Sequence, residues 1–267
     1  MEEDGGYAIW HALFFWDNGT KDADHIMFPD VIQILKMPIM TSHPCLQEIL
    51  GSWRIECSFG GWWYNETSGK AMMTEETWQN IRKRIMQDPR NRSYTERGIP
   101  PILQVNAHAR VLIVGQAPGR KVEESLIPFH DKSGDRLMAW LGIDQDTFYG
   151  EKIAIMPMDF YYPGKGKTGD LPPRKFMSEY HEEILALMPE IQLTVLIGKY
   201  SIDYYLKDQK KKNLRETVHA YQEYLPSFFP IVHPSPLNYR WLKANPWFEE
   251  EVVPALQKEV DRALHTK

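Results

Sequence analysis

The chain has 267 residues, 43% hydrophobic and 12% aromatic, which is enough for a sizeable core and too much for general disorder. No apolar run approaches the roughly 20 residues that cross a bilayer, and the acidic start Met1-Glu2-Glu3-Asp4 has the wrong sign for a leader peptide. The two cysteines, Cys45 and Cys57, exclude a disulfide framework and a four-cysteine metal cluster. We therefore expect a cytoplasmic monomer without membrane association.

Charge is unevenly distributed along the chain, whose formal net charge is −5. Residues 1–72 hold 4 basic and 10 acidic side chains, which leaves 27 basic and 26 acidic ones in residues 73–267. A nearly neutral segment can still present a basic face to phosphate. The total charge therefore does not exclude nucleic acid as a partner.

The composition also changes near residue 72, where we expect a boundary. Residues 1–72 hold five of the nine tryptophans and show no sustained helical or alternating period. Within them, residues 59–64 are typical of a loop or a short strand. This N-terminal extension is either a small β-rich appendage that packs its aromatic side chains on the main domain or a segment without a fold of its own. Residues 73–267 are regular and form the predicted main domain.

A helix is predicted at the start of the main domain. Thr74 is a candidate N-cap, and Trp78, Ile81 and Ile85 follow at helical spacing until Pro89 ends the pattern. Four short apolar runs come next, each of the kind expected for a buried parallel strand. They are residues 111–114, 153–156, 193–197 and 228–232.

Helical stretches separate or follow these runs. Apolar residues at helical spacing mark three of them: Leu137 and Leu141; Phe176, Tyr180, Ile184 and Leu187; and Val253, Leu256, Val260 and Leu264. Pro254 should kink the last helix or lie in its first turn. Strands that alternate with helices predict an α/β fold, a three-layer α/β/α domain with a four-stranded, mostly parallel sheet. Such sheets bind ligands at the carboxyl ends of their strands, where the unusual loops of this chain lie.

The loop after the first strand is Gly115-Gln116-Ala117-Pro118-Gly119. Its glycines permit tight turns and close approach of the backbone, and exposed amides there suit an anionic or carbonyl-rich ligand. Taken alone, such a loop is more typical of a nucleotide site or a plain turn. In the next loop, Phe129 could stack on a flat ring and Asp131 could position a water molecule, or Asp131 or Ser133 could only cap the following helix.

Two further loops are basic or rigid. Lys165 and Lys167 alternate with glycines after the second strand, a pattern typical of a phosphate-contacting loop or of a solvated surface loop. The fourth strand ends in His233-Pro234-Ser235-Pro236-Leu237, followed by Arg240. The prolines fix a rigid loop that can aim the histidine. They also force Leu237 outward, like the apolar wedges that enter unstacked base steps.

In order, spacing and chemistry, these loops resemble the motifs of the uracil-DNA glycosylase superfamily, over roughly residues 73–260. Gly115–Gly119 is similar to the first motif of that superfamily, and His233–Leu237 is similar to the second almost letter for letter. Pro128-Phe129 with Ser133-Gly134 resembles the pocket-lining segment of its family 4 and family 5 enzymes. Residues 1–72 lie outside the resemblance.

The resemblance implies a monofunctional DNA N-glycosylase, which flips a damaged nucleotide out of DNA and hydrolyses its N-glycosidic bond. Neutral His233 and loop amides near Gln116 would donate hydrogen bonds to the departing base anion, and a carboxylate would stabilise the sugar cation and orient the water. The implied base pocket consists of Gly115, Ala117, Pro118, Gly119, Phe129 and Met156. The implied DNA contacts are Ser235, Pro236, Leu237, Arg240, Lys165 and Lys167, with Leu237 filling the vacated space.

The sequence departs from the superfamily pattern at three places. Ala117 stands where family 1 has Asp and Gln116 where family 4 has Glu, whereas Asp131 resembles the acidic position of family 5 and is the candidate for water activation. The Asn that reads uracil in many relatives aligns with Met156, whose thioether cannot supply a paired donor and acceptor. Phe160 stands where families 4 and 5 have a cysteine of their iron–sulfur cluster, so no metal or other cofactor is implied.

Three functions remain open at this point. The leading hypothesis is a glycosylase that acts on uracil or a related altered base in DNA. The second is a catalytically silent DNA-binding member of the same fold. The third is an enzyme that uses the glycine-rich loop for a free nucleotide.

Overall fold

The computed structural model describes residues 63–65, 70–72, 75–167 and 169–265, which belong to one compact unit, Glu56–Lys267. Most of the predicted extension 1–72 lies outside the described residues, as does Thr74, the predicted N-cap. Of the extension, the structure describes an antiparallel pair, β1 (Trp63–Asn65) and β2 (Lys70–Met72). Among the helices described, none is long and apolar enough to cross a membrane.

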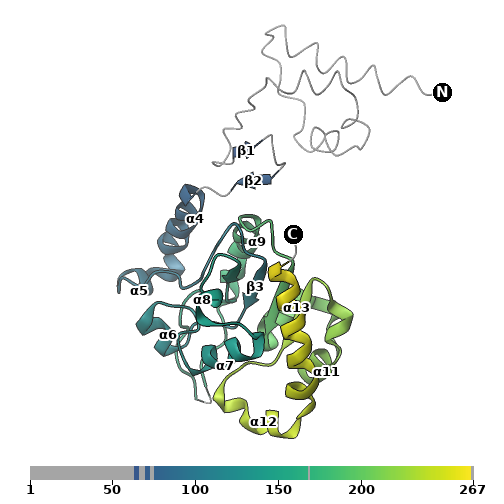
Figure 1. Ribbon diagram of the computed structural model, residues 1–267. Helices are drawn as coiled ribbons and strands as arrows, with labels where there is room; N and C mark the ends of the chain where they lie inside the picture. The colour runs from purple at the N-terminus through teal and green to yellow at the C-terminus, as the bar shows by residue number, and fades with distance from the viewer. Residues whose placement is uncertain (1–62, 66–69, 73–74, 168, 266–267) are drawn as a thin grey trace, which may run out of the picture. The chain divides into compact units, whose positions relative to one another are not determined.

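The four predicted strands form a single sheet (Figure 1). They are β3 (Val111–Val114), β4 (Ile153–Ile155), β5 (Leu193–Ile197) and β6 (Phe228–Ile231). Their order is β4-β3-β5-β6 and every pairing between them is parallel, which confirms the predicted fold class. Pro230 lies in β6, where a missing N–H is tolerated because β6 is an edge strand.

Helices connect the strands and cover the sheet. The α-helices are α4 (Glu75–Gln87), α5 (Arg92–Thr95), α6 (Arg120–Ser125), α7 (Lys132–Leu141), α8 (Gln145–Phe148), α9 (His181–Ala186), α10 (Gly198–Leu206), α11 (Leu214–His219), α12 (Tyr239–Ala244) and α13 (Val253–His265). Short 3-10 helices lie at Pro89–Asn91, Lys175–Tyr180, Lys207–Gln209, Tyr221–Tyr224 and Pro236–Asn238, and a π-helical turn lies at Phe248–Val252.

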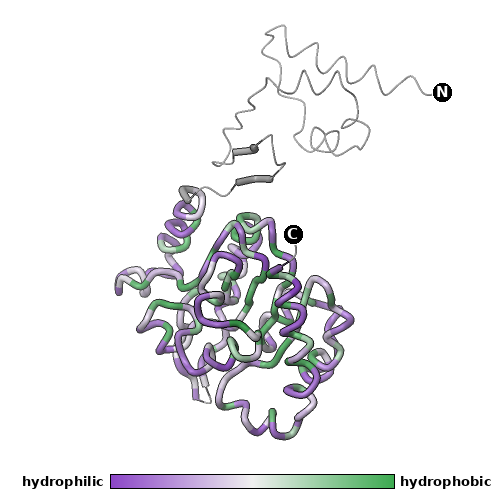
Figure 2. Tube along the Cα trace, viewed as in Figure 1, coloured by the Kyte–Doolittle hydropathy of each residue, from purple (hydrophilic) through white to green (hydrophobic). Residues whose placement is uncertain are grey.

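The sheet separates two apolar cores. In β3, Val111 and Ile113 pack on one face with α7, α8, α11 and α13, whereas Leu112 and Val114 pack on the other with α4, α5, α9 and α10. Burial on both faces explains why the strands are continuous apolar runs in the sequence. Figure 2 shows hydrophobic residues concentrated in the central strands, whereas hydrophilic and hydrophobic residues alternate along the helices. The domain is therefore the three-layer α/β/α structure expected.

The predicted helices hold with one correction. α4 ends just before Pro89, and Pro254 lies in the first turn of α13, both as expected. The stripe from Phe176 to Leu187, however, is not one α-helix, because the 3-10 helix Lys175–Tyr180 precedes α9. A 3-10 helix has fewer residues per turn than an α-helix, so the inward-facing set shifts. The buried residues there are Met177, His181, Ile184 and Leu187, so the predicted Ile184 and Leu187 are buried and the predicted Phe176 and Tyr180 are not.

Candidate active site

The glycine-rich loop after β3 is held by the loop after β4. The carbonyls of Gly115 and Gln116 accept hydrogen bonds from the N–H groups of Met158 and Asp159, at 2.9 and 3.0 Å. The side-chain amide of Gln116 donates to the carbonyl of Leu171 at 3.2 Å. These bonds fix the backbone of the first predicted motif, and they commit one end of the Gln116 side chain to the protein itself.

Phe129 stands beside this loop in an uncommon conformation. Its φ is +54°, a value that non-glycine residues rarely adopt. A Cβ on Gly115 would lie 3.2 Å from Phe129 Cζ, and a Cβ on Gly134 would lie 1.7 Å from the carbonyl oxygen of Phe129. Gly134 therefore has no room for a side chain, because α7 comes this close to the backbone of Phe129, and a side chain at Gly115 would press on the ring of Phe129. The ring of Phe129 also packs edge-on against the ring of Phe148, with a distance of 6.3 Å between the ring centroids.

Asp131 caps α7, the first of the two roles that its sequence position allowed, and its role in positioning water stays a prediction. It is the N-cap of α7, and its Oδ1 accepts hydrogen bonds from the N–H groups of Ser133 and Gly134, at 2.8 and 3.1 Å. Its other oxygen, Oδ2, lies 4.0 Å from where a Cβ on Gly119 would be. Capping therefore engages one carboxylate oxygen and leaves the second facing the glycine-rich loop.

His233 lies just beyond β6, with its ring mostly buried. The N–H of Ser235 donates to its Nδ1 at 3.1 Å, so the neutral ring carries its proton on Nε2. No residue in the described part of the chain pairs with Nε2. Burial lowers the pKa of His233, and the charges of Asp131 and Asp170 partly oppose that shift. Both carboxylates therefore lie near the ring, and the imidazole is held neutral with one free N–H.

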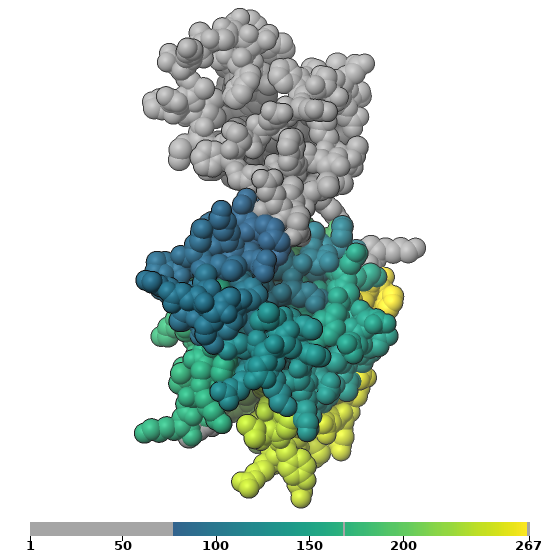
Figure 3. All heavy atoms as spheres, turned by 90° about the vertical axis from the view of Figure 1, so that its left-hand side faces the viewer, coloured from purple at the N-terminus to yellow at the C-terminus, as the bar shows by residue number. Residues whose placement is uncertain are grey.

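The proline-rich loop that follows His233 is braced from within. Asn238 donates from its side chain to the carbonyl of His233 at 2.7 Å, and Arg136 of α7 donates to the carbonyl of Ser235 at 3.2 Å. Ser235 Oγ accepts from the N–H of Leu237, whose side chain is 88% exposed. The loop leads into α12, which projects from the end of the domain away from α4 (Figures 1 and 3). A rigid loop thus presents an apolar tip to the exterior.

The lysine-bearing loop lies between β4 and the helix that begins at Lys175. Lys165 pairs with Asp170 across the loop through their backbones, and the side chains of Lys165 and Lys167 are exposed with no ion pair to any described residue. Asp170 Oδ1 accepts from the hydroxyl of Tyr162 at 3.2 Å. The sequence analysis missed Asp170, because nothing in the sequence sets it apart from the other carboxylates in loops.

A buried ion pair anchors the base of this loop. Asp159 is completely buried and accepts from Arg174 Nε and Nη2, each at 2.8 Å. Arg174 also donates to Asn91 Oδ1 at 2.9 Å. Because the N–H of Asp159 binds the carbonyl of Gln116, the same network ties the lysine-bearing loop to the glycine-rich loop. Breaking it would leave a buried charge without its partner, which is costly.

A comparison of the sequence with models of known protein families finds a match that includes the glycine-rich loop and the loop after β6. The model of the uracil DNA glycosylase superfamily matches residues 103–257, more than half of the chain. The chain belongs to the uracil DNA glycosylase superfamily. Among solved structures, a candidate uracil DNA glycosylase from Methanosarcina acetivorans, determined in solution by NMR, is similar to this chain with 13% sequence identity and a TM-score of 0.36. The alignment covers 58% of this chain and 93% of that one.

The residues at which the sequence departs from the superfamily pattern lie in the core or in the glycine-rich loop. Met156, at the end of β4, is fully buried in the apolar core between the sheet and α9 and α10, and Phe160 is fully buried in the same core. Ala117 and Pro118 complete the glycine-rich loop, with Pro118 buried. Arg240 is exposed on α12, and no described residue pairs with it. The structure brings Gly115, Phe129, Asp131 and His233 together and leaves Lys165, Lys167 and Arg240 on the surface.

Proposed function

We propose that this protein is a monofunctional DNA N-glycosylase that removes uracil or a related altered base from DNA by hydrolysis. The observation that carries the proposal is His233, a neutral imidazole with a free Nε2–H at the carboxyl end of the sheet and two carboxylates nearby. We assign the catalytic domain to residues 73–267 and propose DNA as the partner. We also propose a monomer located in the cytoplasm.

His233 would act on the departing base. Cleavage of the N-glycosidic bond leaves negative charge on the base, and a donor placed at that charge stabilises the transition state by about 3 kcal/mol. The N–H of Ser235 holds Nδ1 as an acceptor, so Nε2 is the donor that faces the ligand. Burial disfavours the charged imidazolium, because the pKa of His233 is lowered. His233 therefore donates a hydrogen bond at neutral pH.

Asp131 would act on the sugar and on the attacking water. The sugar becomes a cation as the base leaves, and a carboxylate near it both stabilises that charge and orients water. Oδ1 of Asp131 is held by two backbone N–H groups, which fixes the orientation of the carboxylate. Oδ2 is left to bind the water. Asp170 adds a second negative charge near His233 and supports the same cation electrostatically.

The remaining residues would hold the flipped nucleotide. Phe129, which lies against Gly115, would stack on the base, and the exposed Leu237 would enter the gap that the base leaves. Base identity is read without the amide that many relatives use, because Met156 occupies that position and is enclosed in the core. We therefore propose a substrate class of altered bases and not strict selectivity for uracil.

The test is a release assay on oligonucleotides that contain uracil, hypoxanthine, xanthine or 5-hydroxymethyluracil, in single and double strands. At least one should yield abasic sites with the wild-type protein, and Asp131→Asn should reduce that rate strongly. Asp135→Asn is the matched control, since Asp135 lies one helical turn away on the exposed side of α7. It should behave like the wild type.

Two outcomes would contradict the proposal. Binding of DNA without release of any base would favour the silent DNA-binding member of the fold. Equal losses in Asp131→Asn and Asp135→Asn would remove Asp131 from the catalytic centre, because the two changes would then share only a general effect of charge.

A further inference from the structure

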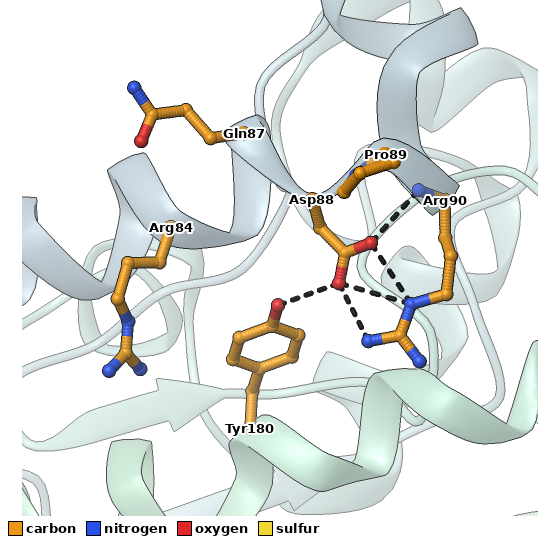
Figure 4. Close-up of a pocket in the computed structure, with 6 residues that line it drawn as sticks. All are labelled: Arg84, Gln87, Asp88, Pro89, Arg90 and Tyr180. Atoms are coloured by element: carbon orange, nitrogen blue, oxygen red, sulfur yellow. Dashed lines mark hydrogen bonds and ion pairs between the residues drawn. The ribbon is translucent and has the colours of Figure 1, made fainter.

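Two hollows in the described surface differ in how their polar groups are used. The larger, about 460 Å³, lies where α4 meets the segment before α9 (Figure 4). There Asp88 accepts hydrogen bonds from Arg90 and from the hydroxyl of Tyr180, and Arg84 pairs with Glu183. Its charged groups bind one another, so it offers little to a ligand.

The smaller hollow, about 340 Å³, lies between α5, α6 and the loop after β4. That volume is at the lower end of the range for sites of small ligands. Three segments line it, and the residues that matter are Tyr94, Arg97, Arg120, Glu123, Tyr162 and Pro163. Arg120 directly follows the glycine-rich loop, and Pro163 comes two residues before Lys165. The hollow is therefore lined by residues adjacent in sequence to the glycine-rich loop, which belongs to the predicted base pocket, and to the lysine-bearing loop, which is predicted to contact DNA.

Two arginines line this hollow, and only one of them, Arg97, has an ion-pair partner among the described residues. Arg97 binds Glu123 through two hydrogen bonds of 3.1 and 3.4 Å and lies over the ring of Tyr94. Arg120 is exposed, and within the described residues it has no ion-pair partner. Burial and the charge of Asp170 raise the pKa of the Tyr162 hydroxyl, and Arg120 opposes this rise. The guanidinium of Arg120 therefore lies near the phenol ring of Tyr162.

We propose that this hollow binds a neighbouring nucleotide of the same DNA strand as the flipped one, a proposal that rests on the proposed function. Arg120 would hold its phosphate, since a guanidinium suits phosphate oxygens. Tyr162 and Pro163 would contact its sugar or base. The hydroxyl of Tyr162 is engaged by Asp170, which keeps that ring in place. The hollow would thus fix the register of the strand relative to His233.

The experiment uses the full chain and oligonucleotides that carry a tetrahydrofuran abasic analogue, lengthened by one nucleotide at a time on either side. Affinity measured by fluorescence anisotropy should rise in a step of about tenfold when the nucleotide that fills the hollow is added, as for one phosphate contact and one stacked group. Arg120→Ala should lose that step. Lys121→Ala is the matched control, because Lys121 is the next residue and does not line the hollow. It should keep the step.

A wild-type series without a step, or a step that survives in Arg120→Ala, would overturn the proposal. Thymidine monophosphate and inorganic phosphate are tested separately, and saturable binding of either one through Arg120 without a length step would assign the hollow to a free nucleotide instead. The readout does not require base release. A step in affinity without catalysis would count against the proposed function alone, whereas catalysis without a step would count against the hollow alone.

Discussion

His181 and His233 are two buried histidines with the same tautomer and different uses of it. The hydroxyl of Tyr205 bonds His181 Nδ1 at 3.0 Å, and Nε2 meets the carbonyl of Pro157 at 3.2 Å. A carbonyl can only accept, so His181, like His233, carries its proton on Nε2. Burial lowers the pKa of both rings. The Nε2–H group of His181 donates a hydrogen bond to the carbonyl of Pro157, whereas the Nε2–H group of His233 has no partner among the described residues.

The difference separates a structural histidine, His181, from the proposed catalytic one, His233. His181 stacks on Phe160 with a centroid distance of 5.6 Å and is fully buried beneath the loop after β4. His233 lies at the ends of the strands, and its free N–H points to chemistry because nothing in the fold requires it. Burial and a shifted pKa are common to both rings, so neither property alone identifies the active site. Among the described residues, the unpaired Nε2 is the property that distinguishes His233 from His181.

The largest expected effect comes from replacing each of the two histidines by alanine, in two separate variants. His233→Ala should lower kcat by about 10²–10³-fold, since one donor to the leaving base is lost. His181→Ala should instead lower the free energy of unfolding by about 2–4 kcal/mol, through a cavity and two lost hydrogen bonds, with kcat per folded molecule unchanged. Urea unfolding and single-turnover base release measure the two effects. A kcat loss of equal size in both variants would end the distinction.

The second expected effect is on the pH dependence of stability. Burial lowers the pKa of His181 from 6.5 to about 4, so between these values the unfolded chain binds a proton that the folded one does not. Its contribution to stability is therefore complete above pH 6.5 and is lost as the pH falls towards 4. The loss reaches about 3 kcal/mol at most.

The measurement is the free energy of unfolding of the wild type and of His181→Phe, taken at intervals from pH 7 to pH 4. Carboxylates titrate equally in both proteins, so they cancel from the difference in slope. The wild type should lose stability more steeply over this range than the variant. Parallel curves would show that His181 is already protonated in the folded state or accessible to solvent.

The same two histidines show how much of the fold and of the candidate site could be predicted from the sequence. His233 could be selected as a site residue because two prolines frame it, and the strands could be found because burial on both faces makes them continuous apolar runs. His181 could be placed on a helical pattern, but the change from 3-10 to α-helix within that pattern has no marker in the sequence. The apolar stripe was therefore assigned to Phe176 and Tyr180 when Met177 and His181 are the buried residues.

Contacts between segments that are far apart in the sequence could not be predicted. Asp170 comes near His233, and Arg136 reaches the carbonyl of Ser235, only because α7 and the loops after β4 and β6 lie at the same end of the sheet, where the parallel strands have their carboxyl ends. The double use of Asp131 could not be derived either. Capping and catalysis were alternatives in the sequence, and only the geometry shows that capping engages one carboxylate oxygen and leaves the other facing the glycine-rich loop.

The smallest expected effect concerns the residues that hold each histidine. Tyr205→Phe removes the partner of His181 Nδ1 and should cost about 1 kcal/mol of stability, with no change in kcat. Asn238→Ala removes the hydrogen bond to the carbonyl of His233. We expect it to lower kcat about fivefold, because a loss of roughly 1 kcal/mol in the interactions that orient the imidazole would raise the energy of the transition state by that amount. KM should stay the same, since the bond to the base anion forms only in the transition state. An Asn238→Ala variant that raises KM and keeps kcat would mean that this side chain positions Leu237 on DNA and leaves the imidazole as it was.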